Sequence, residues 1–159
     1  MSTISFPATF PIVGLPLFAT FALNASPSCR HALYQSMSVM SARKAAGVKY
    51  PTLYASEADA AADAKKMKFN CAQRAHANTL ESAPYILSLF GFLSIFHPKI
   101  ASIAQLLWVV GRVGYTRGYA TGEPAKRING LTKLSYVGMA ILLFGTLGVS
   151  AQKTYALFF

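Results

Sequence analysis

Three polar residues with helical spacing stand in the polar first half of a segment whose second half is apolar. Arg74, Asn78 and Glu81 lie at positions i, i+4 and i+7, so on a helix they fall within about 60° of one another. A charged side chain at membrane depth is costly, and it normally faces a bundle interior or a wet cavity. The spacing predicts a polar functional site inside the bundle. The simpler alternative is an Arg–Glu pair that only holds the bundle together.

A second polar group follows in the next apolar segment. Arg112, Tyr115 and Tyr119 lie at i, i+3 and i+7, again on one helix face. Tyrosine is a common anchor at membrane interfaces, and that role alone would explain Tyr119. Arg112 lies deeper in its segment, where an interface anchor does not explain it.

The residue types in these two groups suit the binding of a small polar anion. Guanidinium groups bind carboxylates in a bidentate manner, and a carboxylate such as Glu81 can bind an ammonium group. An arginine beside a thiol stabilises the thiolate, which is the nucleophilic form. A pocket of this kind, open sideways to lipid, would serve a polar anion that reacts with a hydrophobic second substrate.

The composition indicates a small integral membrane protein with a single domain, residues 1–159. Hydrophobic residues make up 53% and charged residues 13%, whereas a soluble domain carries about 25% charged residues. Fifteen Lys and Arg stand against five Asp and Glu, but they flank apolar segments and form no dense basic run, so we expect no nucleic-acid partner. Cys29 and Cys71 have neither a disulfide pattern nor metal-ligand spacing with the histidines, and no metal is expected.

The apolar segments predict an all-α fold, a four-helix transmembrane bundle. Three clear spans lie near 69–96, 99–121 and 131–151, and an irregular first span lies within 6–43. A span of this length can cross a bilayer core of about 30 Å. Three prolines (Pro7, Pro11 and Pro16) and the polar stretch NASPSCRH interrupt the first span.

The connections carry further signals. Pro84 is a candidate kink in the second span, and His97-Pro98 predicts a tight turn into the third. The chain from Lys44 to Lys68 is expected to be a loop, with a turn at Tyr50-Pro51 and a short surface helix in SEADAAADAKK.

Positive charge in the short connections predicts the orientation. The first and third connections are rich in Lys and Arg, whereas the second holds only Lys99. The first and third should therefore face the cytosol, with both termini on the other side. This topology places Arg43, at the end of the first span, and Arg127, before the last span, at the depth of the two polar groups.

The stretches FNCAQRAHANTLE and WVVGRVGYTRGYATGEPAKR resemble the membrane-associated proteins in eicosanoid and glutathione metabolism (MAPEG) family. The pattern Arg-Ala-x-x-Asn-x-x-Glu is the family signature, and the resemblance runs from about residue 41 to 130. It implies homotrimers of four-helix protomers in the endoplasmic reticulum membrane, with the active site toward the cytosol. It also implies that glutathione, as a co-substrate, binds between neighbouring subunits.

The resemblance also assigns roles to residues by position. The residues that match glutathione-binding positions are Arg43, Arg74, Asn78, Glu81, Tyr115 and Tyr119. The catalytic arginine that stabilises the thiolate falls at Arg127 if the loop after Tyr119 has one extra residue, and at Lys126 without that residue. Some members carry a tyrosine directly after the glutamate, where this chain has Ser82. The interrupted first span is a second departure from the family pattern.

The implied function is that of a membrane-bound glutathione transferase with glutathione-dependent peroxidase activity. Its hydrophobic substrates would be lipid electrophiles or hydroperoxides that enter from the membrane lipid, and its chemistry would need no metal. The alternative is a non-catalytic lipid-binding scaffold of the same family. A channel or transporter subunit would need polarity along a whole helix, whereas here the outer halves of the helices are apolar.

Overall fold

The computed structural model describes residues 7–24 and 34–159, and helices are the regular elements throughout these two ranges. In chain order they are η1 (Phe10–Val13), α1 (Gly14–Asn24), α2 (Tyr34–Ala46), α3 (Glu57–Ala62), α4 (Ala64–Phe96), α5 (Pro98–Ala120), η2 (Pro124–Arg127) and α6 (Lys133–Phe158), where η marks a 3-10 helix. Most of the polar stretch NASPSCRH, with Cys29, lies outside the described residues. The all-α prediction is confirmed for the described part of the chain.

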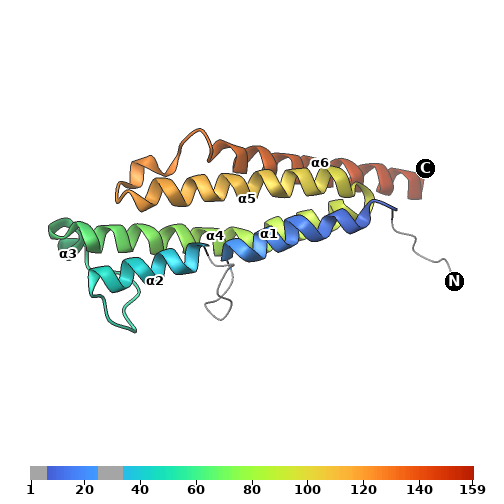
Figure 1. Cartoon of the computed structure of the whole chain (residues 1–159). Helices are drawn as coiled ribbons and strands as arrows, with labels where there is room; N and C mark the ends of the chain where they lie inside the picture. Colours follow the sequence, from blue (N-terminus) through green and yellow to red (C-terminus); the bar gives the residue numbers. More distant parts are fainter. Residues whose placement is uncertain (1–6, 25–33) are drawn as a thin grey trace.

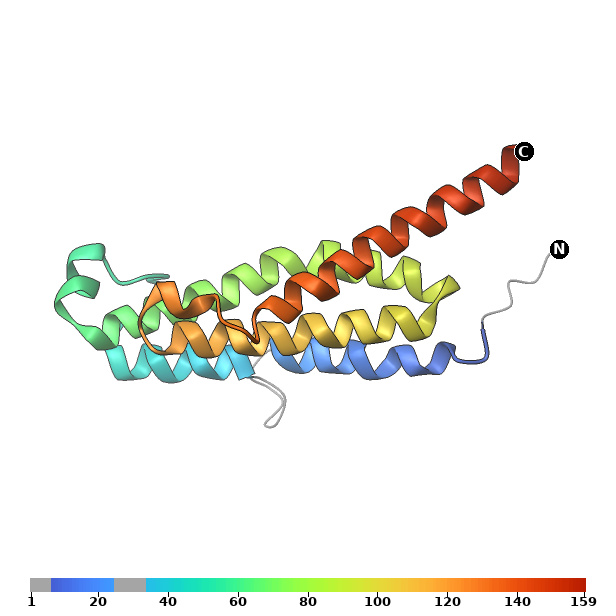
Figure 2. The same ribbon diagram turned by 90° about the horizontal axis from the view of Figure 1, so that it is seen from above.

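Three long helices and two half-length helices build the bundle. Helices α4, α5 and α6 run along its length, and α1 and α2 lie almost end to end beside them (Figure 1). Helix α2 packs mainly against α4, and α1 packs mainly against α5. The short helices α3 and η2 lie at one end, opposite the C-terminal end of α6 (Figure 2). The first and third connections therefore share one end of the bundle.

The prolines of the N-terminal segment stand where helices tolerate them. Pro11 occupies the first turn of η1, and Pro16 is the third residue of α1. Backbone N–H groups in the first turn of a helix have no intrahelical acceptor, so proline loses no hydrogen bond there. The prolines thus set where these short helices start and do not break them.

Side-chain caps define the connection between α2 and α4. The Ser56 hydroxyl accepts a hydrogen bond from the Asp59 N–H at the start of α3, and the Asp63 carboxylate accepts one from the Lys65 N–H at the start of α4. Such caps satisfy N–H groups that a helix start leaves unpaired. The predicted surface helix is confirmed as α3. The predicted loop from Lys44 to Lys68 is wrong at both ends, because α2 continues to Ala46 and α4 begins at Ala64.

The chain turns sharply between α4 and α5. Helix α4 continues through Pro84 to Phe96, and α5 starts at Pro98 after the single residue His97. The predicted turn at His97-Pro98 is confirmed. The hydrophobic core of this half of the bundle consists of residues from η1, α4, α5 and α6: Val13, Ile86, Phe90, Leu93, Ala101, Ala104, Trp108, Val109, Leu142 and Val149.

Glycines allow α5 and its neighbours to approach closely. A methyl group on Gly111 would overlap the Ser135 backbone in α6, and one on Gly138 would overlap the Ala104 carbonyl oxygen in α5. Small residues at such crossings let helix backbones touch, as is common between transmembrane helices. This close packing brings α6 against the part of α5 that carries Arg112.

Two described helices, α4 and α6, are long and apolar enough to cross a membrane. Their outward faces carry large apolar side chains, among them Phe92, Ile95, Val137, Phe144 and Leu147. An apolar exterior of this kind suits a protein surrounded by lipid. Helix α5 covers the range of the third expected span, but it contains buried polar residues such as Gln105 and Arg112, which lower its mean hydropathy.

Candidate functional site

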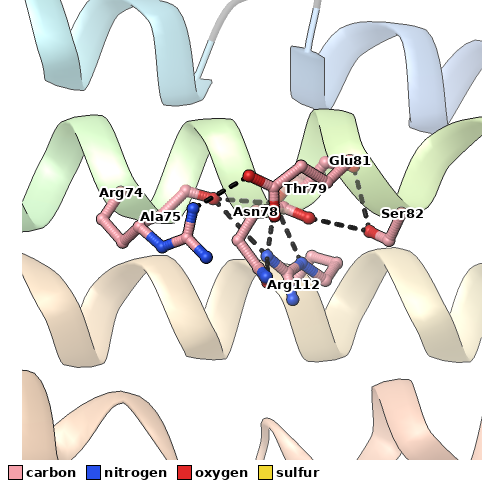
Figure 3. Close-up of polar contacts among 7 residues, drawn as sticks. All are labelled: Arg74, Ala75, Asn78, Thr79, Glu81, Ser82 and Arg112. Carbon is pink, nitrogen blue, oxygen red and sulfur yellow. Dashed lines mark hydrogen bonds and ion pairs between the residues drawn. The ribbon is translucent and has the colours of Figure 1, made fainter. Parts of the chain in front are cut away.

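A buried arginine occupies the middle of the bundle. Arg112 of α5 is only 7% exposed. Its Nε and Nη2 donate to the Thr79 hydroxyl at 2.9 and 2.6 Å, and Nη2 also donates to Asn78 Oδ1 at 3.0 Å (Figure 3). The guanidinium carbon lies 4.1 Å from the centre of the Tyr115 ring, a distance typical of a cation–π contact. These contacts hold the guanidinium between α4 and α5.

The partners of Arg112 in the described part of the chain are neutral. Its hydrogen bonds go to a hydroxyl, an amide and a carbonyl oxygen. The ion pairs found within residues 7–24 and 34–159 are Lys66–Asp59, Arg74–Glu81 and Lys126–Glu123. A buried charge without a counter-ion is costly. The site therefore keeps a positive charge that an anionic ligand can neutralise.

A cavity of about 330 Å³ lies beside Arg112. Its wall is formed by α4, α5, the loop after η2 and the start of α6, through Asn78, Ser82, Tyr85, Trp108, Arg112, Tyr115, Arg127, Ile128, Ser135, Tyr136 and Met139. The residues of this wall carry two guanidinium groups, three phenols, two hydroxyls and an amide, and the Arg127 Nη1 donates to the Pro124 carbonyl at 2.8 Å. This combination can bind an anion and donate several hydrogen bonds to it.

Packing of the η2 loop against α5 brings Arg127 to this cavity. The Arg127 carbonyl accepts from the buried Thr132 hydroxyl at 2.8 Å, and Asn129 donates to the Gly114 carbonyl of α5 at 2.9 Å. A methyl group on Gly118 would overlap the carbonyl oxygen of Lys126. The loop backbone therefore lies directly on α5, because glycine leaves room for it.

Lys126, the basic residue before Arg127, does not belong to the cavity wall. Lys126 is exposed and pairs with Glu123 at 2.6 Å. It is absent from the cavity wall that contains Arg127. Of the two residues that the resemblance allowed for thiolate stabilisation, Arg127 is the one that faces the same space as Arg112.

The predicted stripe on α4 divides into an outward part and an inward part. Arg74 and Glu81 form an ion pair at 2.8 Å, with side chains 49% and 56% exposed. Asn78, between them, contacts Arg112 (Figure 3). The ion pair therefore lies on the surface of the chain, next to the cavity.

The two predicted tyrosines pack together inside the bundle. The rings of Tyr115 and Tyr119 meet edge to face, with centroids 5.1 Å apart. Both are 7% exposed, and they pack with Ala75 and the free thiol of Cys71 on α4. Tyr115 lines the cavity, whereas Tyr119 lies one turn farther along α5, toward the end that carries η2.

Arg43 lies apart from the cavity. Its Nη1 donates to the Thr52 carbonyl at 2.7 Å, and its guanidinium carbon lies 4.3 Å from the Tyr50 ring centre and 4.5 Å from that of Phe69. This arginine anchors the α2–α3 connection to α4.

The structure thus brings part of the predicted set together and adds to it. Asn78, Tyr115 and Arg127 share the cavity with Arg112 and Ser82. Arg112 was missing from the residues assigned by resemblance, although its spacing from Tyr115 had already placed both on one face. Within the described ranges, no three His, Cys, Asp or Glu side chains are close enough together to hold a metal ion.

One comparison with known proteins bears on this site. The model of the MAPEG family matches residues 31–148, a range that begins just before α2 and ends near the middle of α6. It contains every residue of the cavity and leaves out α1. A family model that covers this much of the chain establishes membership: the chain belongs to the MAPEG family.

Proposed function

We propose that this chain is a membrane-bound glutathione transferase with glutathione-dependent peroxidase activity on lipid electrophiles and hydroperoxides. The stretch GEPAKR resembles microsomal glutathione S-transferase 3 of this family, and this likeness supports the proposal. The observation that carries the proposal is a cavity whose wall contains both Arg112 and Arg127 and no carboxylate among its residues.

The proposed chemistry starts from a thiolate. Arg127 stabilises the glutathione sulfur as the anion, which is far more nucleophilic than the thiol. In conjugation, the sulfur attacks an electrophilic carbon of the lipid, such as an epoxide carbon or the β-carbon of a conjugated carbonyl. The C–O bond or the C=C π bond at that carbon breaks, and the resulting anion takes up a proton. In peroxide reduction, the sulfur attacks an oxygen of the hydroperoxide, the O–O bond breaks, and the lipid leaves as its alcohol after protonation. The resulting sulfenic acid condenses with a second glutathione to give the disulfide and water.

The remaining polar residues would bind the rest of the tripeptide. Arg74 suits a glutathione carboxylate, and Glu81 suits its ammonium group. Asn78, Tyr115 and Tyr119 would supply hydrogen bonds between these ends. Because the Arg74–Glu81 pair is about half exposed on a single protomer, a neighbouring subunit would enclose it, which supports a homotrimer with glutathione at the subunit boundary. Arg43 would reach the ligand only after leaving Thr52.

The proposed location is the endoplasmic reticulum membrane, with the site toward the cytosol. The lysine-rich α2–α4 connection and the η2 loop lie at the same end of the bundle (Figure 2). Positive residues in short connections favour the cytosolic side. Arg127 and Ile128 of the η2 loop belong to the cavity wall, so soluble glutathione would approach the cavity from that end.

The test uses purified protein in detergent with glutathione and a lipid hydroperoxide. We expect the wild type to show the ultraviolet absorbance of a bound thiolate and to reduce the hydroperoxide. Arg127→Ala should lower kcat about 100-fold, since loss of a charged group at a developing or bound anion has effects of that order. The matched control is Lys126→Ala, which removes an exposed charge from the adjacent position and should leave the thiolate signal intact.

Two results would refute this proposal. A wild type that binds glutathione without forming a thiolate and without turnover would not be a transferase or a peroxidase. A wild type that binds no glutathione in calorimetry but binds fatty acid would be the lipid-binding scaffold.

A further inference from the structure

A buried hydrogen-bond network connects Arg112 to the broken first span. Gln35 of α2 is 1% exposed, and its Nε2 donates to Thr79 Oγ1 at 2.9 Å and to Thr116 Oγ1 at 2.6 Å. Thr79 of α4 is fully buried and also accepts from Arg112. Three helices thus meet through side-chain hydrogen bonds at the position of the arginine.

The number of protons and lone pairs on each hydroxyl determines which group donates and which accepts in this network. A hydroxyl has one proton to donate and two lone pairs to accept with. Thr79 donates its proton to the Ala75 carbonyl, and Thr116 donates its proton to the Arg112 carbonyl. Both oxygens are therefore acceptors toward the interior. The amide N–H₂ of Gln35 bridges them, and this leaves one lone pair of Thr79 Oγ1, which the Nε and Nη2 groups of Arg112 share.

The same network fixes the guanidinium of Arg112. Its Nε and Nη2 both point at Thr79 Oγ1, so one edge of the planar group is held against α4 (Figure 3). Nη1 lies outside these bonds, and the side chain lines the cavity. A guanidinium held along one edge presents its charge in one direction, and preorganisation of this kind makes a charged group effective in binding an anion.

We propose that Thr79 and Gln35 are positioning residues that hold Arg112 in the orientation required by the anion in the cavity. This inference rests on the proposed function, in which Arg127 stabilises the glutathione thiolate, and it adds Arg112, which lines the same cavity, as a second positive charge toward that anion. Thr79 acts directly on the guanidinium, and Gln35 acts through Thr79. Helix α2 therefore contributes to the site although, among the described side chains, none of its residues lines the cavity.

The main variant is Thr79→Val, which preserves the shape of the side chain and removes the hydroxyl. Loss of a hydrogen bond to a charged group corresponds to about a tenfold effect or more. We therefore expect about a tenfold loss of kcat and a shift of about one pH unit upward in the pH at which half of the bound glutathione is thiolate. Thr79→Ser should restore both to within about twofold, because it retains the hydroxyl. Gln35→Met should act in the same direction with a smaller effect.

The matched control is Thr146→Val. Thr146 of α6 is partly buried and donates to the Leu89 carbonyl at 3.3 Å, away from the cavity wall. The same substitution there should leave the thiolate pH profile of the wild type unchanged. A purely structural role for the Thr79 hydroxyl would lower thermal stability in both variants without moving that profile.

A second measurement is independent of glutathione. Hydrogen exchange of the Arg112 Nε–H, followed by NMR in detergent, should be slow in the wild type and fast in Thr79→Val. If exchange and pH profile both remain as in the wild type, Thr79 does not position Arg112 and the inference is wrong. If the wild type forms no thiolate, the proposed function fails while the exchange experiment still decides the role of Thr79.

Discussion

Arg112 and Arg74 are arginines on two helices that pack together, α5 and α4, yet their surroundings differ. Arg112 is buried among neutral oxygens, whereas Arg74 is half exposed and paired with Glu81. A paired surface arginine has most of its charge neutralised and contributes little to stability. A buried arginine with neutral partners keeps its charge at the expense of stability. The difference fits the proposed roles, in which Arg112 faces an anion in the cavity and Arg74 and Glu81 bind the two opposite charges of a ligand at the surface.

The largest effect should follow from removing the buried charge. Arg112→Met replaces the guanidinium by an apolar chain of similar length. We expect a fall in kcat of about 100-fold or more, with a melting temperature equal to or above that of the wild type, because a buried charge without a counter-ion is replaced by an apolar group. Activity assays and thermal unfolding in detergent check this result.

Arg117→Met is the control, since Arg117 is an exposed basic residue on the same helix. A marked loss of stability in Arg112→Met with unchanged kcat would instead make Arg112 a structural residue.

The next largest effect should follow from moving the η2 loop, which brings Arg127 to the cavity beside Arg112. Gly118→Ala would push the Lys126 backbone away from α5, and with it Arg127. We expect about a tenfold loss of kcat, comparable with the loss of one hydrogen bond to a charged group. Gly91→Ala is the matched control, because a methyl group on Gly91 meets no atom within 4 Å. Full activity of Gly118→Ala would show that the loop position is not required for catalysis.

Substitutions in the Arg74–Glu81 pair should change the KM for glutathione, whereas Arg112→Met should change kcat. Arg74→Ala and Glu81→Ala should each raise the KM for glutathione by up to about tenfold, as expected for the loss of a charge-assisted hydrogen bond. The free energy of unfolding should change by no more than about 1 kcal/mol, since the pair is about half exposed. Steady-state kinetics and thermal unfolding measure the two quantities. Unchanged KM values in both variants would exclude the pair from the glutathione site.

The smallest effect is expected at the exposed pair between α3 and α4. The hydrogen bond from Lys66 holds the pKa of the Asp59 carboxyl below its usual range. A lowered pKa in the folded state means that the pair stabilises the fold at neutral pH and that this contribution disappears as the pH falls through the folded-state pKa. Lys66→Ala should bring the pKa back toward its usual value, measurable by NMR titration, and should leave kcat unchanged.

The sequence predicted which segments are helical better than it predicted which side chains meet. Apolar stretches and the His97-Pro98 turn define the order of the long helices, because both signals are local. The start of α4 was placed too late, since the capping role of Asp63 depends on a single side-chain hydrogen bond.

Within the site, the helical spacing predicted which residues share a helix face, but it did not predict how deeply each side chain is buried. Arg74 and Asn78 were expected on one face, and about 40° of helix rotation separates an i, i+4 pair, enough to turn Asn78 inward and leave Arg74 exposed. Arg43 was expected at the same depth as the others, but its contacts with Tyr50 and Thr52 depend on the fold of the α2–α3 connection. No spacing rule encodes such contacts.

Helix α6 links the cavity to the thickness of the membrane. Its 26 residues span about 39 Å, and the helix inclines away from the bundle toward its C-terminus (Figure 2). The stretch between Lys133 and Lys153 spans about 29 Å, close to an apolar bilayer core of about 30 Å. A helix whose apolar stretch does not match the bilayer thickness adapts by tilting. Because Ser135, Tyr136 and Met139 of this helix form one wall of the cavity, lipids of different chain length would alter the angle of that wall. Bilayer thickness is therefore a physical variable of the site, alongside its charge.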